Sequence, residues 1–211
     1  MVRFTADMIE AALRKPLPGL KAQLRMAPRP GSLKPPSPES KPRKSGVLIL
    51  LFPSLETGEL CLVLTRRTES VADHKGQISL PGGAVDPDDP SITHTALREA
   101  CEEVGVCSDN MRVLGSLTPI YIPPSDFCVQ PFVAYLSNSP QFFPQPEEVA
   151  EILEVPLPYL LDEKNVVVEE WFFDEEAKQV PFFNVYGHKV WGATAVVLSE
   201  FVCILEGLKE E

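Results

Sequence analysis

The sequence predicts an α+β fold in which a mixed β-sheet is flanked by helices. Short apolar runs typical of strands and amphipathic segments typical of helices follow one another without the regular βαβ alternation of a parallel sheet. The chain has 211 residues, of which 44% are hydrophobic and 23% are charged, as in ordinary globular proteins. A chain of this length accommodates one domain with an appendage and can bury a core without disulfides or a structural metal.

Two segments precede the body of the predicted domain. Residues 5–16 are expected to form a helix, because Thr5 is a suitable N-cap and Met8, Ile9, Ala12 and Leu13 share one apolar face. Residues 26–45 are rich in proline, which blocks both helix and sheet, so we expect an extended connector. We therefore divide the chain into a basic N-terminal segment, residues 1–45, and a folded domain, residues 46–211.

Within this domain, apolar runs bounded by turn residues predict strands, and longer periodic segments predict helices. The strands are expected at residues 46–52, 60–65, 111–117, 129–135 and 166–173, and the helices at residues 90–104 and 193–208. For the first of these helices, Asp89 is the expected N-cap, Pro90 the first helical residue and Gly105 the stop. The aromatic residues near 171–173 and 182–183 are expected to belong to strands and core rather than to a stacking platform.

Charge and cysteine content narrow the classes of function. Residues 1–45 carry a net charge of +7, and the remaining residues carry −18. An acidic body excludes general nucleic-acid binding, and no apolar run is long enough to cross a membrane. The five cysteines form no C-x-x-C pair, so we expect free thiols and a cytoplasmic location. The basic segment could contact a phosphate group of a ligand or a partner subunit, or be a solvated tail.

The helix expected at residues 90–104 carries the chemistry. At about 100° per residue, Glu99, Glu102 and Glu103 fall on one face, where neighbouring Cβ atoms lie about 5–6 Å apart. A hard divalent cation such as Mg²⁺ or Mn²⁺ relieves the repulsion between such carboxylates. The glycines of residues 81–83 let the backbone approach a metal or a phosphate closely. The pattern favours phosphate chemistry at a metal-activated water, although such a helix alone is more often only a solvated surface.

Residues 83–106 resemble the Nudix box, G-x5-E-x7-R-E-U-x-E-E-x-G-U, in which U is apolar. The matching residues are Gly83, Arg98, Glu99, Ala100, Glu102, Glu103, Gly105 and Val106. Asp89 replaces the first glutamate of the box, and eight residues rather than seven separate it from Arg98. The resemblance implies the Nudix fold, an α/β/α sandwich whose loop–helix–loop carries the box. It also implies an enzyme that hydrolyses a diphosphate bond in a nucleoside diphosphate derivative.

The segment upstream of the box, residues 62–83, is similar to the signature of the coenzyme A diphosphatase branch of that family. The matching residues are Thr65, Arg67, His74, Gly76, Gln77, Pro81, Gly82 and Gly83. That branch also has an acid and a longer spacer where this chain departs from the box. Segments 15–28, 147–162 and 190–198 are similar to the same branch. The resemblance implies Mg²⁺- or Mn²⁺-dependent hydrolysis of coenzyme A or acyl-CoA to 3′,5′-ADP and (acyl-)4′-phosphopantetheine.

The same resemblance implies roles for individual residues. Glu99 and Glu103 are the expected metal ligands, together with the carbonyl group of Gly83. Glu102 is a further ligand or the general base, and Arg98 orients the acids of the box. Catalysis is thus assigned to Glu102, Glu103 and Arg98.

Substrate binding is assigned to four residues upstream of the box, which are Arg66, Arg67, His74 and Gln77. For the two arginines, surface cations that end a strand are an equally good interpretation. A base from a later loop is the alternative to Glu102, with Glu147 and Glu148 as candidates.

Two other functions remain open at this point. A Nudix enzyme could act on another substrate, such as ADP-ribose or NADH, because specificity lies in loops that one sequence defines poorly. A Nudix fold could also serve as a binding module without catalysis, although none of the three helix carboxylates is lost. The expected partner is a small-molecule substrate rather than nucleic acid or membrane, and a homodimer is left open.

Overall fold

The computed structural model describes residues 3–28, 33, 35–37, 39–69, 76–107, 110–173 and 176–210. The helices are α1 (Ala6–Leu13), α2 (Leu20–Gln23), α3 (Ile92–Val104), α4 (Leu157–Leu160) and α5 (Gly192–Glu210), with 3₁₀ turns η1 (Leu24–Met26) and η3 (Glu163–Asn165). The strands are β1 (Arg43–Pro53), β2 (Leu60–Arg67), β3 (Ile78–Ser79), β4 (Gly82–Ala84), β5 (Arg112–Ser116), β6 (Ile120–Ile122), β7 (Phe127–Tyr135), β8 (Val149–Pro156), β9 (Val166–Phe173), β10 (Glu176–Val185) and β11 (His188–Val190).

Strand β1 lies at the centre of an eight-stranded mixed sheet. It runs parallel to β7 along most of its length and antiparallel to β4 and β2, which pair with its two ends. The strand order is β3-β2-β1-β7-β5, with β4, β6 and β8 pairing with β1, β7 and β2. The predicted mixed sheet is therefore confirmed.

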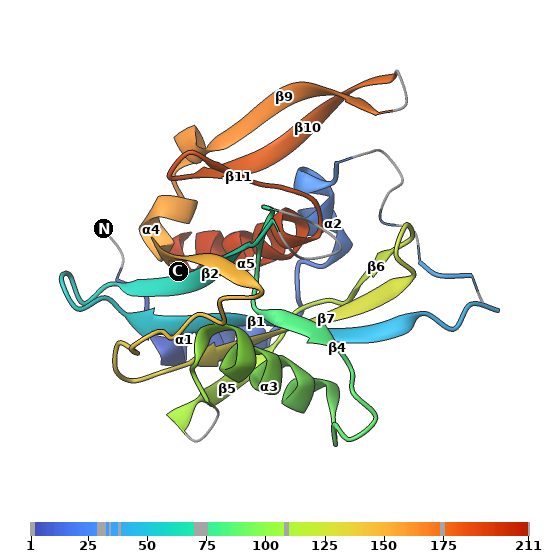
Figure 1. Cartoon of the computed structure of the whole chain (residues 1–211). Coiled ribbons are helices and arrows are strands. Elements are labelled where there is room, and N and C mark those ends of the chain that lie inside the picture. The colour runs from blue at the N-terminus through green and yellow to red at the C-terminus, as the bar shows by residue number, and fades with distance from the viewer. Residues whose placement is uncertain are drawn as a thin grey trace.

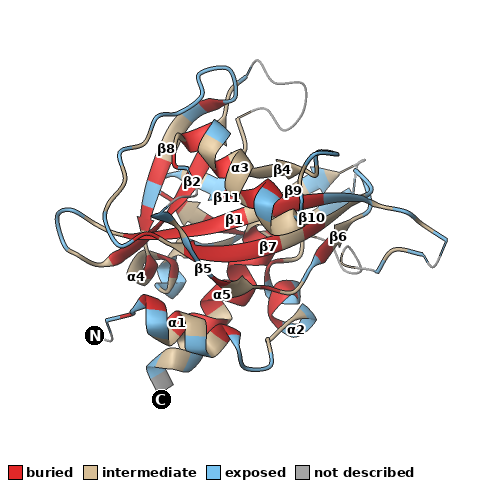
Figure 2. Ribbon diagram, turned by 90° about the horizontal axis from the view of Figure 1, so that it is seen from below, coloured by how far each residue is buried: buried red, intermediate tan, exposed pale blue. Residues whose placement is uncertain are grey.

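Helices cover both faces of this sheet, as Figure 1 shows. Alternate residues of a strand point to opposite faces, and β1 uses this to fill two separate cores. Leu48, Leu50 and Phe52 pack in the cluster that includes α3. Ile49 and Leu51 pack in the larger cluster that includes α1 and α5. Figure 2 shows buried residues concentrated along these central strands. The layers are those of the expected α/β/α sandwich.

The N-terminal segment is part of this packing. The backbone N–H of Met8 donates to the Thr5 hydroxyl, as expected for an N-cap, and Ile9 is fully buried. Farther along, the side chain of Gln23 donates to the buried carboxylate of Glu200 on α5 at 2.9 Å. The described residues 3–28 are thus not a solvated tail, because their apolar face fits between β5 and α5.

The predicted strands and both long helices are present with shifted ends. Strand β1 begins at Arg43, inside the segment expected to be a connector. Strands β3, β4, β6, β8, β10 and β11 are not among the predicted strands, although Phe182 and Phe183 of β10 are expected to be strand residues. The alternating burial of β8 is readable from Val149, Leu153 and Val155. In the part of the chain that the structure describes, no helix has both the length and the apolar character needed to cross a membrane.

A second, three-stranded antiparallel sheet is formed by β9, β10 and β11 and lies beyond α5 in Figure 1. The Trp171 ring contacts Trp191, with centroids 5.0 Å apart, and stacks on buried Phe182. The expectation that these aromatics pack as core is wrong for Phe172, which is 70% exposed. Phe172 lies on β9, an edge strand of this sheet, in which exposed and half-buried residues alternate.

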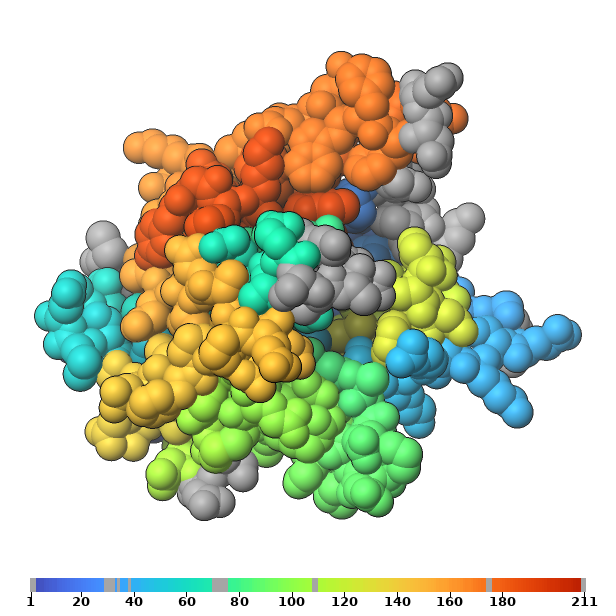
Figure 3. All heavy atoms as spheres, viewed as in Figure 1, coloured from blue at the N-terminus to red at the C-terminus, as the bar shows by residue number. Residues whose placement is uncertain are grey.

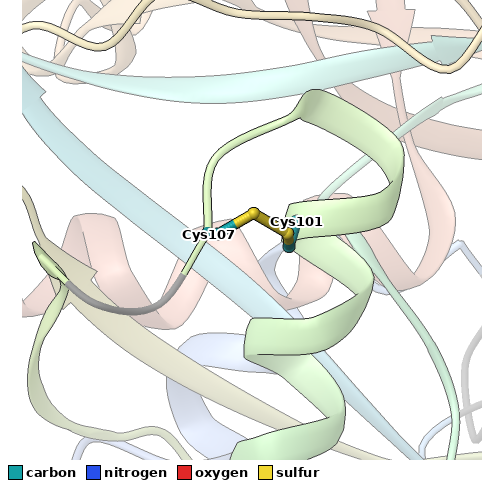
Figure 4. Close-up of a disulfide and its surroundings, with 2 residues drawn as sticks. All are labelled: Cys101 and Cys107. Atoms are coloured by element: carbon teal, nitrogen blue, oxygen red, sulfur yellow. A yellow bond between two sulfur atoms is a disulfide. The ribbon is translucent and has the colours of Figure 1, made fainter.

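Two cysteines are not free, contrary to expectation. A disulfide joins Cys101, in the last turns of α3, to Cys107 (Figure 4). Gly105 adopts a left-handed conformation with φ of 74°, which turns the chain back after the helix. The Cα atoms of the two cysteines therefore lie 4.4 Å apart, within the range for a disulfide. Among the described residues, the free cysteines are Cys61, Cys128 and Cys203.

Candidate active site

Helix α3 and the strand that precedes it position the acidic residues. The helix begins at Ile92 with Ser91 as its N-cap, whose hydroxyl accepts from the backbone N–H of His94 at 3.1 Å. The expected cap, Asp89, is not used in this way because its carboxylate binds other groups. On the opposite side of the helix, Ala96 and Ala100 pack against the sheet.

The glycines before the helix allow a close approach. A side chain at Gly83 would lie 2.4 Å from the carboxyl carbon of Glu99, so this carboxylate rests directly against the backbone of β4. At Gly82, a side chain would meet the backbone of β1 at Gly46, 2.4 Å away. The pair of glycines therefore brings the backbone of β4 and the acidic face of α3 into contact.

The carboxylate of Asp89, just before α3, takes part in several hydrogen bonds. Its side chain is only 2% exposed, and both of its oxygens accept hydrogen bonds from Arg98, each at 3.1 Å. The Thr95 hydroxyl, a His94 ring nitrogen and the backbone N–H of Asp86 complete the set. The Arg98 guanidinium in particular holds the pKa of Asp89 well below its usual range.

Arg98 connects Asp89 to the box acids. Its guanidinium lies 2.9 Å from a carboxylate oxygen of Glu99 and 2.8 Å from one of Glu102, and it also donates to the carbonyl of Ala84. These carboxylates raise the pKa of Arg98, and the hydrogen bonds to Asp89 make the largest contribution. The guanidinium of Arg98 thus contacts three carboxylates and a backbone carbonyl.

The three helix carboxylates that share one face on a helical wheel differ in exposure. The Glu102 side chain is 57% exposed, that of Glu99 is 17% exposed, and Glu103 as a whole residue is 5% exposed. The difference arises because β4 and the segment before β8 cover the side of α3 that carries Glu103. Only the tertiary structure shows which of these acids is enclosed.

Glu103 is a buried carboxylate that is incompletely hydrogen-bonded by the described residues. Its Oε2 atom accepts no hydrogen bond from any residue in the described part of the chain. Burial raises the pKa of Glu103 to about 8, and the negative charge of Glu99 adds to this, whereas Arg67 opposes it. Burial also raises the pKa of Glu99, and its hydrogen bond with Arg98 opposes the shift.

The segment before β8 brings a further acid to the same place. The backbone N–H groups of Phe143 and Gln145 donate to the carbonyls of Val104 and Glu103, each at 2.9 Å. Figure 3 shows this gold segment lying directly against the green of α3. The negative charge of Glu148 raises the pKa of both Glu99 and Glu103, so it lies within electrostatic reach of both. The backbone carbonyl of the other candidate, Glu147, accepts from the Thr68 hydroxyl.

The two adjacent arginines at the end of β2 have different surroundings. Arg66 donates to Glu151 at 2.8 Å, an ion pair on β8. The pairing of β2 with β8 shifts register between Arg66 and Arg67. Arg67 acts electrostatically on Glu103, and its buried Nε atom has no hydrogen-bond partner among the described residues. The geometry thus separates two residues that the sequence could not distinguish.

Of the other two predicted substrate-binding residues, only Gln77 belongs to the part of the chain that the structure describes. The backbone carbonyl of Gln77 accepts from the N–H of Arg67 at 3.0 Å, which places Gln77 next to the site. His74 lies outside the residues that the structure describes. Its substrate-binding role stays a prediction.

The donor set fits a divalent cation of the magnesium type. No three histidine, cysteine, aspartate or glutamate side chains in the described ranges converge as a complete set of ligands. Mg²⁺ needs few protein carboxylates, because it keeps water and takes oxygens from substrate phosphates. The Oε2 atom of Glu103, which has no partner among the described residues, and the carboxylate of Glu99 against Gly83 are oxygens of the kind that such an ion takes.

Comparison with known proteins agrees with this geometry. A family model described as the NUDIX domain matches residues 42–174. The uncharacterized Nudix hydrolase NudL of Pectobacterium atrosepticum is 38% identical over 79% of this chain and 85% of its own length. NudL of Photorhabdus laumondii is 34% identical, covering 79% of this chain and 88% of its own length. Nudix hydrolase 15, mitochondrial, of Arabidopsis thaliana is 33% identical over 75% of this chain and 57% of its own length.

Solved structures support the fold. The MutT protein of Methanosarcina mazei superposes with a TM-score of 0.52, at 19% identity, over 83% of this chain and 100% of that protein. A MutT/nudix family protein of Enterococcus faecalis gives a TM-score of 0.50, at 16% identity, over 100% of this chain and 76% of that protein. At such identities the likeness concerns the fold alone.

Proposed function

Because this chain belongs to the Nudix family of hydrolases, enzymes that act on nucleoside diphosphate derivatives, we propose that it hydrolyses the diphosphate bond of coenzyme A or acyl-CoA. The products are 3′,5′-ADP and 4′-phosphopantetheine, or its acyl form. The observation that carries this proposal is the buried carboxylate of Glu103, whose Oε2 atom has no protein partner among the described residues and faces other acids. Such a group is stable as an anion only when a cation joins it.

Nudix hydrolases need divalent metal ions, and the metal here is proposed to be Mg²⁺ or Mn²⁺. Glu99 and Glu103 would hold it, with the carbonyl of Gly83 and with Glu102 as a further ligand. A bound divalent ion lowers the pKa of water and neutralises phosphate oxygens. Arg98 does not need to contact substrate in this scheme, because its guanidinium is occupied by Asp89, Glu99 and Glu102.

The general base is proposed to be Glu148, with Glu102 as the alternative. Glu148 is exposed and lies in electrostatic contact with both proposed metal ligands, and the backbone carbonyl of Glu148 accepts from the N–H of Thr68 at 2.9 Å. Glu102 is ion-paired with Arg98 at 2.8 Å, which lowers its availability as a base. A Glu148→Gln variant that lost turnover but kept metal affinity would favour Glu148, whereas the same result for Glu102→Gln would favour Glu102.

Substrate phosphates are proposed to meet Arg67, because its charge acts on Glu103 and its Nε atom has no hydrogen-bond partner in the described part of the chain. Gln77 and His74 are proposed to contact the substrate next to it. Arg66 is the weaker candidate, since Glu151 already neutralises it. The preference for coenzyme A is supported by the similarity of residues 62–83 to the diphosphatase signature, and it goes beyond the family assignment.

Two further proposals concern the setting of the enzyme. We propose a cytoplasmic location, although one premise of that prediction, free cysteines, does not hold for Cys101 and Cys107. We also keep the prediction of a small-molecule substrate without nucleic acid or membrane as partners. A homodimer remains a hypothesis that sedimentation of the purified protein would test.

The experiment is hydrolysis of coenzyme A by the purified protein with Mg²⁺ or Mn²⁺, beside ADP-ribose and NADH. Wild type should release 3′,5′-ADP from coenzyme A, and Glu103→Gln should not. Turnover confined to ADP-ribose or NADH would reject coenzyme A but keep the metal mechanism. Failure to turn over any of the three, with no Mn²⁺ binding, would support a binding module instead.

A further inference from the structure

The disulfide between Cys101 and Cys107 lies at the metal-binding end of α3. Cys101 directly precedes the Glu102–Glu103 pair, and Cys107 follows the turn made by Gly105. Figure 4 shows the bond linking the last turns of the helix to the chain that leaves it. Cys107 is exposed and Cys101 is half-buried, so a soluble thiol can reach the bond. The bond therefore connects an accessible position to the acids of the site.

The turn closed by this bond is packed on both sides. A side chain at Gly105 would lie 2.6 Å from the Cβ atom of Phe143, so the segment before β8 rests on the turn itself. Val106, next to Cys107, is buried in the core cluster that includes α3. The position of the turn thus determines where the segment before β8 can lie.

Hydrogen bonds continue from this turn to the proposed base. Phe143 and Gln145 donate from the backbone to the last carbonyls of α3, those of Val104 and Glu103. The carbonyl of Gln145 in turn accepts from the backbone N–H of Glu148 at 3.1 Å. A shift in the end of α3 would therefore move both the carboxylate of Glu103 and the segment that carries Glu148.

We propose that the Cys101–Cys107 bond is a redox-sensitive tether that holds the metal-binding end of α3 in its active arrangement. A dithiol reductant would attack one sulfur to give a mixed disulfide, and its second thiol would then release the protein. Two electrons and two protons pass to the protein in total, which gives two cysteine thiols and an oxidised, disulfide form of the reductant. Where disulfides occur in reducing compartments, they are usually transient and redox-sensing.

Reduction would loosen the site rather than unfold the domain. The bond closes a short loop, and its loss would free residues 101–107 to sample other conformations. Groups that orient metal ligands typically change metal affinity by about 10- to 100-fold when they are lost. We expect weaker Mn²⁺ binding by about tenfold on reduction, with full recovery on reoxidation.

The test compares oxidised and dithiothreitol-reduced protein. Alkylation after denaturation should label three cysteines in the oxidised protein and five after reduction. Mn²⁺ titration should show weaker binding by the reduced form, and the melting temperature should fall by about 5 °C. Cys101→Ser should show the weak binding of the reduced form with or without reductant. Cys128→Ser, which removes a free cysteine, should respond to reductant as wild type does.

If Cys101→Ser fails to fold, wild-type protein reduced and then alkylated in its native state replaces it. Equal Mn²⁺ affinity in the two redox states, or five labelled cysteines without reductant, would overturn the proposal. The Mn²⁺ affinity and the turnover rest on the proposed function, but the cysteine labelling and the melting temperature do not. A redox-dependent metal affinity without turnover of coenzyme A would reject the substrate and keep the tether.

Discussion

At the start of α3 both oxygens of Asp89 accept several hydrogen bonds, whereas at its end one oxygen of Glu103 accepts none from the described residues. Both carboxylates are nearly inaccessible to solvent, with 2% of the Asp89 side chain and 5% of Glu103 exposed. Protein donors lower the pKa of the first, and burial raises that of the second. The comparison teaches that burial alone does not define a ligand site. What distinguishes the two is whether protein donors reach both oxygens of the carboxylate.

The largest loss of turnover is expected when the carboxylate of Glu103 is replaced. Glu103→Gln should lower turnover by at least about a hundredfold, because a proposed metal ligand is lost. The variant should remain folded in the absence of metal, since a pKa of about 8 keeps Glu103 mostly protonated at neutral pH and the amide of Gln is close in size to that neutral carboxyl. Turnover and Mn²⁺ titration measure the first effect and thermal melting the second. If Glu103→Gln kept its activity, Glu103 would not be a metal ligand needed for turnover, and its difference from Asp89 would have no functional meaning.

A smaller loss of turnover is expected when Asp89, the hydrogen-bonded carboxylate at the start of α3, is replaced. Asp89→Asn removes the negative charge and one of the two oxygens that accept from Arg98. Arg98 is then held less firmly beside Glu99 and Glu102, and turnover should fall by about 10- to 100-fold. Asp88→Asn, an exposed neighbour in the same loop, is the matched control and should keep turnover. Initial rates at saturating Mg²⁺ are the measurement. If the two variants behaved alike, Asp89 would have no positioning role.

The two adjacent arginines of β2 allow a second comparison, because only Arg67 acts electrostatically on Glu103. Arg67→Ala should lower kcat/KM by about tenfold, because a positive group facing substrate phosphates is lost. Arg66→Ala removes only a partly exposed ion pair with Glu151 and should change kcat/KM by less than about twofold. Steady-state kinetics on the preferred substrate measure both. A larger loss for Arg66→Ala would reverse the assignment of the phosphate-binding residue.

The raised pKa of Glu103 should also make the stability of the metal-free protein depend on pH. The pKa of Glu103 is about 8 in the folded chain, well above its value of about 4.3 in an unfolded chain. The unfolded state therefore releases its proton first, and metal-free stability should fall as the pH rises from about 5 to 8. Melting curves of wild type should shift downward across this range, and those of Glu103→Gln should shift less. Saturating Mn²⁺ should reduce the shift, whereas a flat metal-free profile would contradict the raised pKa of Glu103.

Much of this site was accessible from the sequence. The spacing of Glu99, Glu102 and Glu103, together with the glycines before them, predicted a helix that carries acids toward a metal. The mixed sheet and both long helices followed from local periodicity. These features are local, because helix and strand periods, caps and glycine turns are set by residues a few positions apart.

Other features depended on contacts between distant segments. The enclosure of Glu103, but not Glu102, depends on the segment before β8, which lies some forty residues along the chain. The difference between Arg66 and Arg67 arises from the shift in register between β2 and β8.

The disulfide depends on the turn at Gly105, and its cysteine spacing matched none of the pairings recognised in the sequence. The amino-acid sequence by itself determined which acids share a helix and which family the chain resembles. Only the tertiary structure decided which of those acids is buried without a partner, because burial and charge pairing are produced by segments that meet only in the folded chain.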